Sequence, residues 1–215
     1  LKVKYPQGAE KQLIRALIKR EVPSGRLPLD VNAVVHNVGT AFAVYEAVQK
    51  NKPLFERVVT ITGKSLPKPG NYIVRTGTPV IKLIEAAGGL PEDTGKVVSG
   101  GPMMGKALAN TDVPVVKGTS GLVVFPQSES ERHAPEPCIR CAKCVSACPL
   151  GLEPYLLMVL AQKGMFEKAE KERITDCMEC GSCSFTCPAS RPLLDYIRLG
   201  KSTVIRLSRE KVLKK

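Results

Sequence analysis

The eight cysteines of the sequence fall into two runs with identical spacing. Each run reads C-x₂-C-x₂-C-x₃-C-P, first over residues 138–149 and again, 39 positions later, over residues 177–188. Three cysteines spaced three apart let one looping segment reach three irons of a cubane cluster, and in two-cluster ferredoxins the fourth ligates the other cluster. The spacing therefore predicts two [4Fe–4S] clusters: cluster 1 on Cys138, Cys141, Cys144 and Cys187, and cluster 2 on Cys177, Cys180, Cys183 and Cys148.

Two other chemistries for these cysteines fit the pattern less well. Tetrahedral zinc takes two ligands from each of two short Cys knuckles, so the third cysteine of each run would have no role. A disulfide scaffold would spread its bridges over the fold, whereas all eight cysteines lie within 50 residues. We expect reduced thiolates on metal in a cytosolic compartment. Because such clusters leave no iron open to substrate, we expect one-electron transfer and assign no catalytic residue.

The first half of the chain has the pattern of an α/β protein. Apolar residues recur at helical spacing over residues 9–20 and 40–51, and residues 31–35 are typical of a short buried strand. The opening residues read as the middle of a domain, so we expect a piece of a longer polypeptide. Helix, strand and helix in this order predict part of a Rossmann-like layer.

A second module is predicted after residue 57. Strands are indicated at 58–63, 72–77 and from 96, and Thr78 is expected to cap a short helix that starts at Pro79 and ends on Gly88 and Gly89. The pattern predicts a β-grasp-like fold, so the fold class is α+β. The expected domains are a Rossmann-like part (1–56), a β-grasp domain (57–105), a return strand and linker (106–128), a helical two-cluster domain (129–200) and a basic tail (201–215).

The chain has 43% hydrophobic and 24% charged residues, an ordinary composition, and no apolar run of the roughly 20 residues that a transmembrane helix needs. Its net charge is +12, of which residues 189–215 contribute eight Lys and Arg against two acidic residues. Such a segment suits an acidic partner beside the second cluster or an anionic membrane surface; a solvated terminus is the alternative. The last nineteen residues hold no aromatic side chain to stack bases, so no nucleic acid is expected.

Several segments together resemble the RnfC family, whose members belong to the Rnf complex, a membrane-bound, ion-translocating oxidoreductase between ferredoxin and NAD. They are KYPQGAEKQLI (4–14), VHNVGTAFAVYEAV (35–48), residues 57–89, SGGPMMG (99–105) and the two cysteine runs. The first part is also similar to the flavoprotein of respiratory complex I, and residues 57–105 resemble a soluble-ligand-binding β-grasp (SLBB) domain. The resemblance implies electron transfer between NAD(H), through FMN, and other subunits of the complex or a ferredoxin-like carrier. It also implies a peripheral place on the cytoplasmic side of the bacterial inner membrane.

By motif match, the resemblance assigns FMN binding to Glu10, Asn37 and Thr40. His36 and Gly39 depart from the family pattern, and the glycine-rich phosphate loop of such a domain is not in these residues, so a complete flavin site is expected only in a longer protein. Asn37 and Thr40 also suit a turn and a helix cap. Two other functions remain open: a cobalamin reductase with the same domain order, and a non-catalytic adaptor that docks redox proteins.

Overall fold

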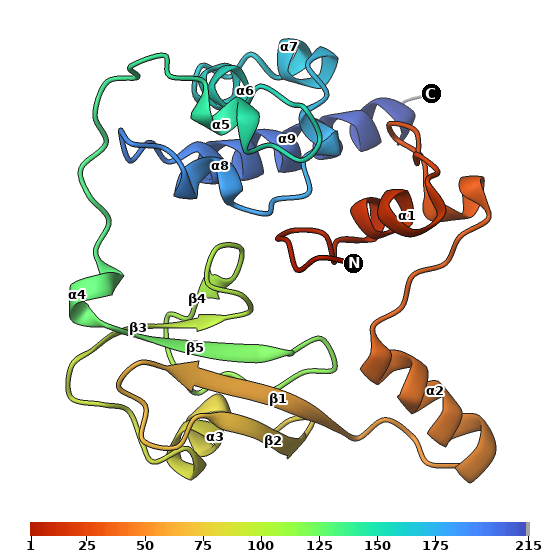
Figure 1. Ribbon diagram of the computed structural model, residues 1–215, viewed down its shortest axis with the longest axis vertical. Coiled ribbons are helices and arrows are strands. Elements are labelled where there is room, and N and C mark those ends of the chain that lie inside the picture. The colour runs from red at the N-terminus through yellow and green to blue at the C-terminus, as the bar shows by residue number, and fades with distance from the viewer. Residues whose placement is uncertain (214–215) are drawn as a thin grey trace. The chain divides into compact units, whose positions relative to one another are not determined.

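The computed structural model describes residues 1–213, which form two compact units (Figure 1). The sheet unit comprises His36–Arg132. The cysteine unit combines residues 1–35 with the chain from His133 onward, so it is built from two segments that are far apart in the sequence. Together they give the α+β class that the sequence predicts. The last two residues of the expected basic tail lie outside the described residues.

The sheet unit is built on five strands: β1 (Glu56–Gly63), β2 (Gly70–Arg75), β3 (Thr94–Ser99), β4 (Lys106–Ala107) and β5 (Gly121–Pro126). They lie in the order β2-β1-β5-β3-β4. β1 and β5 are parallel and every other neighbouring pair is antiparallel, which makes the sheet mixed. The strand at 121–126 therefore sits at the centre of the sheet, between the first and third strands of the module (Figure 1).

One helix, α3 (Val80–Ala86), covers the apolar face of this sheet (Figure 1). β1 alternates as a half-buried strand should, with Val59 and Ile61 fully buried and Val58 exposed. The helix begins one residue later than expected because Pro79 is extended (φ −59°, ψ 139°). It ends at Ala86, two residues before the predicted end at Gly88 and Gly89, whose φ angles of 102° and 89° favour glycine.

Two further helices belong to the sheet unit: α2 (Val38–Lys50) and α4 (Gln127–Ser130). The apolar spacing over residues 40–51 predicts a helix with a packed face, but the structure buries none of the residues of α2. Phe42, Tyr45 and Val48 stay 49–70% exposed, because no described element covers that face of the helix. The segment 31–35, expected as a strand, is not one. Its first residue, Val31, ends the 3₁₀ turn η1 (Pro28–Val31), and the segment has no strand partner among the described residues.

The cysteine unit is helical and repeats itself. Its elements are α1 (Glu10–Ile18), α5 (Lys143–Ser146), α6 (Pro154–Gln162), α7 (Phe166–Lys171), the 3₁₀ turn η2 (Ile174–Asp176), α8 (Ser182–Phe185) and α9 (Leu193–Leu213). α8 starts 39 residues after α5, and α9 starts 39 residues after α6, the offset of the two cysteine runs. The second half of the unit thus reproduces the first.

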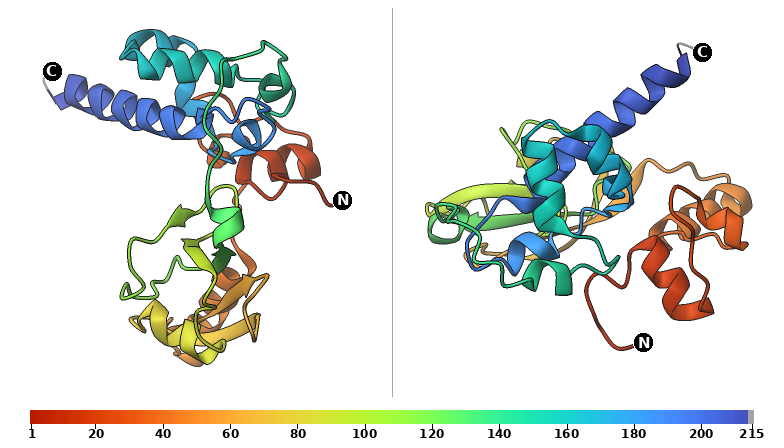
Figure 2. Two further views of the ribbon diagram at one scale, coloured as in Figure 1. Left: turned by 90° about the vertical axis from the view of Figure 1, so that its left-hand side faces the viewer. Right: turned by 90° about the horizontal axis from the view of Figure 1, so that it is seen from above.

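The long helix α9 runs through the cysteine unit and packs along α6 (Figure 2). Leu157, Leu193 and Ile197 are fully buried in the core that these helices share. Gly200 lets the helices approach closely, since a Cβ there would lie 2.7 Å from the Cβ of Ala161. Among residues 1–213, no helix is both long enough and apolar enough to cross a membrane.

Candidate metal centres

The two cysteine loops adopt the same backbone conformation. In the first, Arg140 and Ala142 have φ angles of 57°, and in the second the corresponding residues Glu179 and Gly181 have φ angles of 59° and 82°. Alternation of right- and left-handed residues turns successive N–H groups to one side, which makes a concave site for an anion. Each loop is therefore shaped to surround a negatively charged group.

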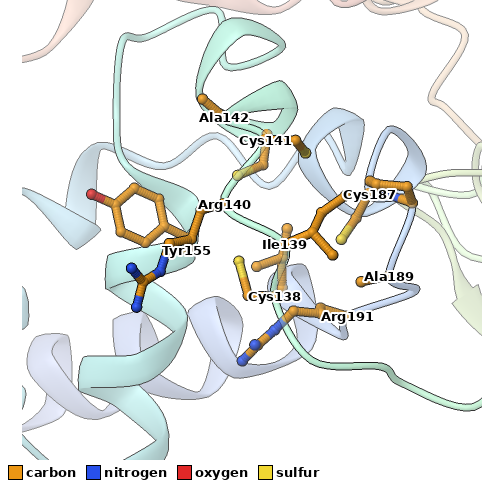
Figure 3. A pocket seen from close by; sticks show the side chains of 12 residues that line it. Cys138, Ile139, Arg140, Cys141, Ala142, Tyr155, Cys187, Ala189 and Arg191 are labelled. Atoms are coloured by element: carbon orange, nitrogen blue, oxygen red, sulfur yellow. The ribbon is translucent and has the colours of Figure 1, made fainter.

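The first loop borders a cavity of about 400 Å³ at the surface of the cysteine unit. Cys138, Cys141 and Cys144 line it together with Cys187, the last cysteine of the second run. Figure 3 shows the labelled cysteine side chains turned toward this common space, with Arg140 and Tyr155 at its edge. Three thiols of one run thus meet a fourth thiol from the other run.

A second, narrower cavity of about 20 Å³ lies beside the second loop. Cys177, Cys180 and Cys183 line it together with Cys148, the last cysteine of the first run. The lining side chains at the matched positions differ between the two cavities. Where the first cavity has Tyr155 and Arg191, the second has the apolar residues Leu194 and Leu152.

The second set of thiols is the more deeply buried. Cys180 and Cys183 are each 8% exposed, whereas Cys138 and Cys141 are open to solvent. Burial, together with the neighbouring Cys177, raises the pKa of Cys183 to about 12. Burial also raises the pKa of Cys177, although the backbone N–H of Glu179 acts in the opposite direction. Metal ligands are thiolates, so a bound cation must supply the stabilisation that these buried thiolates lack.

A group of charges surrounds the second loop. The Glu179 carboxylate forms ion pairs of 3.1 Å with both Arg198 and Lys201 of α9. The Lys201 ammonium also donates to the backbone oxygen of Cys177 at 2.6 Å. The N–H of Glu179 donates to the sulfur of Cys177 at 3.4 Å. These contacts fix the second loop to α9 and balance the charge of Glu179.

The donor chemistry of both cavities fits an iron–sulfur cluster. Each is lined by four thiols, and no imidazole or carboxylate occurs among the described residues that line them. Four thiols are the donor set of a [4Fe–4S] cluster, and the concave backbone suits its negative charge. Within residues 1–213, no group of three or more His, Cys, Asp or Glu side chains is arranged around a single metal ion.

The three residues expected near a flavin are divided between the units. Glu10 is the first residue of α1 in the cysteine unit, while Asn37 and Thr40 lie at the start of α2 in the sheet unit. Asn37 caps α2, because its side-chain oxygen accepts a bond from the N–H of Gly39 at 2.9 Å. The N–H of Thr40 donates to the Asn37 backbone oxygen at 2.9 Å. Asn37 and Thr40 are therefore neighbours at the start of α2, while Glu10 belongs to the other unit.

Sequence reasoning missed the residues that attach the N-terminal segment to the rest of the cysteine unit. The Tyr5 hydroxyl donates to the backbone oxygen of Cys180 at 2.5 Å, and the Gln12 amide donates to that of Pro149 at 3.1 Å. The Ser24 hydroxyl donates to the Asp176 carboxylate at 2.6 Å. These partners lie 137 to 175 residues apart, so no local pattern could have revealed them.

Three models of protein families match consecutive parts of the chain. Residues 1–46 match the Nuo51 FMN-binding domain, residues 58–107 the SLBB domain, and residues 130–189 the 4Fe-4S dicluster domain. The last match contains all eight cysteines. The SLBB match spans β1 to β4 of the sheet unit, and the first match runs across the boundary between the two units.

Three relatives, each named as the C component of an oxidoreductase complex, align with nearly the whole chain. That of the proton-translocating ferredoxin:NAD(+) oxidoreductase complex of Clostridium ljungdahlii is 48% identical over 94% of the chain and 44% of its own length. That of the Na(+)-translocating ferredoxin:NAD(+) oxidoreductase complex of Acetobacterium woodii is 45% identical over 98% of the chain and 47% of its own. The C component of the ion-translocating oxidoreductase complex of Rhodobacter capsulatus is 41% identical over 92% of the chain and 38% of its own length.

The chain is a homologue of these RnfC-type proteins. It spans less than half the length of each of the three relatives. The resemblance to the RnfC family seen in the sequence is thereby confirmed. The chain combines a piece of the FMN-binding domain with the SLBB and dicluster domains.

Proposed function

We propose that this RnfC-type chain carries electrons one at a time through two [4Fe–4S] clusters. Cluster 1 is held by Cys138, Cys141, Cys144 and Cys187, and cluster 2 by Cys177, Cys180, Cys183 and Cys148. The observation that carries the proposal is the lining of the two cavities, each by three thiols of one run and the last thiol of the other.

The bound clusters would supply reversible one-electron oxidation and reduction. The residues of the chain hold and insulate them. Both loops present backbone N–H groups to a negative centre. The exchanged fourth ligands tie the loops to each other, so metal binding and the packing of α5, α6, α8 and α9 are coupled. Lys201 holds the second loop against α9 through the Cys177 backbone.

A longer RnfC protein would use these clusters in ferredoxin:NAD oxidoreduction, the activity in the names of two of the relatives. We place FMN and NAD(H) in its completed Rossmann-like domain, with Glu10, Asn37 and Thr40 near the flavin. The match of residues 1–46 to the Nuo51 FMN-binding domain supports this assignment. As part of the proposal we keep the domain division expected from the sequence, with bounds at 1–56, 57–105, 106–128, 129–200 and 201–215.

The partners would be the other subunits of the membrane complex and a ferredoxin-like carrier. The protein would lie peripherally on the cytoplasmic face of the inner membrane. The names of the relatives, which describe components of ion-translocating complexes, support this placement.

Metal analysis tests the central proposal. Protein purified without oxygen, or reconstituted, should carry about eight iron and eight acid-labile sulfide per chain. Its broad visible absorbance should bleach with dithionite, because both centres accept one electron. Stoichiometric zinc without sulfide would show that the cysteines serve another purpose.

A further inference from the structure

The two candidate centres differ in how they meet solvent. Cys138 and Cys141 are exposed, and the cavity they line is bordered by Ile139 and Tyr155, which are 68% and 42% exposed. Cys180 and Cys183 are buried. A carrier protein that approaches the cysteine unit from solvent can therefore come close to cluster 1 but not equally close to cluster 2.

The second loop is also covered by the chain itself. Tyr5 and Gln12 of the N-terminal segment hydrogen-bond to backbone oxygens at or beside ligands of cluster 2, one to Cys180 and the other to Pro149. Glu179, which follows Cys177 by two residues, is engaged by Arg198 and Lys201. These polar groups of the second loop are thus already bonded within the cysteine unit.

The first loop carries free positive charge at the matched position. Arg140 corresponds to Glu179, and both Arg140 and Lys143 are exposed side chains without an ion-pair partner among residues 1–213. Arg191 also lines the first cavity. Two carboxylates occur in the adjacent segments: Glu136, and Glu153, which accepts a hydrogen bond from Tyr155 at 3.1 Å. The face therefore has more cations than anions, on a chain whose net charge is +12.

We propose that the exposed rim of cluster 1 is the docking surface for an acidic one-electron carrier protein, with Arg140 and Lys143 as its electrostatic contacts. This rests on the proposed function, since docking there has a purpose only if a cluster occupies the cavity. Exposed cations beside a redox centre steer an acidic partner to it, and exposed apolar groups such as Ile139 provide the close contact. Electrons would then pass between a carrier docked at cluster 1 and cluster 2, whose loop is covered by the N-terminal segment.

The basic end of α9, expected from the sequence to receive the partner, is a poorer place for exchange. Arg206 lies 13 residues beyond Leu193, which lines the first cavity. At 1.5 Å per residue the separation along the helix is about 20 Å. Arg206 is moreover paired with Glu210 at 2.9 Å. A carrier held at that end would be centred away from the exposed first cavity, and the loop nearest to it, through Lys201 and Cys177, is the buried second one.

A double variant, Arg140→Glu with Lys143→Ser, tests the proposal with side chains that the chain already carries in its second loop. It installs the residues that the second loop carries at the same positions, Glu179 and Ser182, so the left-handed conformation of residue 140 is kept. The control, Lys163→Glu with Lys168→Ser, makes the same change in charge at exposed positions, one at the end of α6 and one on α7, that line neither cavity. Both proteins are first assayed for iron and sulfide, which should match the wild type.

The measurement is the second-order rate of electron transfer from the dithionite-reduced protein to an oxidised, acidic two-[4Fe–4S] ferredoxin, followed by stopped flow. At low ionic strength the Arg140 and Lys143 variant should react about tenfold more slowly, and the control within about threefold of the wild type. The difference should shrink at about 0.5 M salt, where the Debye length is only a few ångströms. Reduction of a small neutral dye, which needs no electrostatic docking, should not become slower, because loss of positive charge makes reduced cluster 1 a stronger reductant. Slower reduction of the ferredoxin alone therefore reports docking and not a loss of driving force.

Equal slowing of both variants would overturn the proposal, because it would show a dependence on total charge alone. An unchanged rate, or a loss of binding to phosphatidylglycerol vesicles without a loss of electron transfer, would overturn it too and assign the face to the membrane surface. These outcomes leave the clusters in place. A wild-type protein without iron and sulfide would instead remove the proposed function itself.

Discussion

Arg140 and Glu179 occupy the same position in the two cysteine loops, with φ angles of 57° and 59°, and carry opposite charges. Arg140 is exposed beside the first cavity, whereas Glu179 is neutralised by Arg198 and Lys201. Reduction adds a negative charge to a cluster, so an adjacent cation favours the reduced state and burial opposes it. We therefore expect the more exposed cluster 1 to have the higher reduction potential. The neighbouring charges do not decide the order, because Glu179 with Arg198 and Lys201 carries the same net charge of +1 as Arg140.

Replacing Arg140 by Gln should lower the potential of cluster 1 and leave that of cluster 2 almost unchanged. An exposed charge near the cluster contributes about 0.5–1 kcal/mol, which is about 20–40 mV for a one-electron couple. A redox titration monitored by EPR measures both potentials. Lys163→Gln, at the exposed end of α6, serves as the control and should shift neither. A shift of the lower-potential cluster alone would contradict the placement of Arg140.

The exchange of fourth ligands can be tested with two single variants. Cys148→Ala should damage the cluster held by the second run and leave the first mostly intact, because Cys148 lines the second cavity. Cys187→Ala should have the reverse effect, since Cys187 lines the first. Iron analysis, with EPR of the remaining cluster, shows which of the two clusters each variant has lost. If each variant lost the cluster of its own run instead, the ligands would not be exchanged.

Gly200→Ala should destabilise the cysteine unit by roughly 1–3 kcal/mol, the usual cost of overpacking a tight core. The added methyl group would meet the Cβ of Ala161 at 2.7 Å and the Cδ1 of Ile174 at 2.8 Å, so α6 and α9 would have to separate. Thermal unfolding followed by circular dichroism gives the change. Ser202→Ala, at an exposed position of the same helix, is the control and should lie close to the wild type.

Removal of the clusters should raise hydrogen exchange in the cysteine unit but not in the sheet unit. The core of the cysteine unit contains Cys183 and packs against further cysteines, whereas the core of the sheet unit contains none. Hydrogen exchange of protein treated with oxidant and chelator should therefore rise across α5, α6, α8 and α9, with β1, β3 and β5 still protected. Equal loss of protection in both units would contradict independent cores.

The flavin assignment is tested in a longer RnfC protein. Asn37→Ala should lower FMN occupancy there while iron and sulfide stay constant. It also removes the cap of α2, which costs about 1 kcal/mol. Asn37→Ser separates the two effects, since serine caps a helix but lacks the amide. If the serine variant kept full FMN and the alanine variant lost it, Asn37 would act through the helix alone.

Local pattern predicted much of the molecule but not its long-range contacts. The 39-residue repeat was visible in the cysteines, and the end of α3 was visible in Gly88 and Gly89. The strand expected at 31–35 does not form, because apolar alternation specifies a strand only where a partner strand is present. The exposed face of α2 and the bond from Tyr5 to Cys180 depend on tertiary neighbours, which periodicity does not reveal.

The joining of residues 1–35 to the chain beyond His133 imposes an order on the assembly of the cysteine unit. Tyr5 precedes the carbonyl it binds by 175 residues. At a synthesis rate of about 5–20 residues per second, the N-terminal segment waits roughly 10–35 s for its partner to be made. The sheet unit, whose whole chain lies between the two segments, can fold in that interval. Attachment of Tyr5 therefore follows the synthesis of Cys180, and a nascent chain whose second cysteine loop is not yet formed presents this segment unbound.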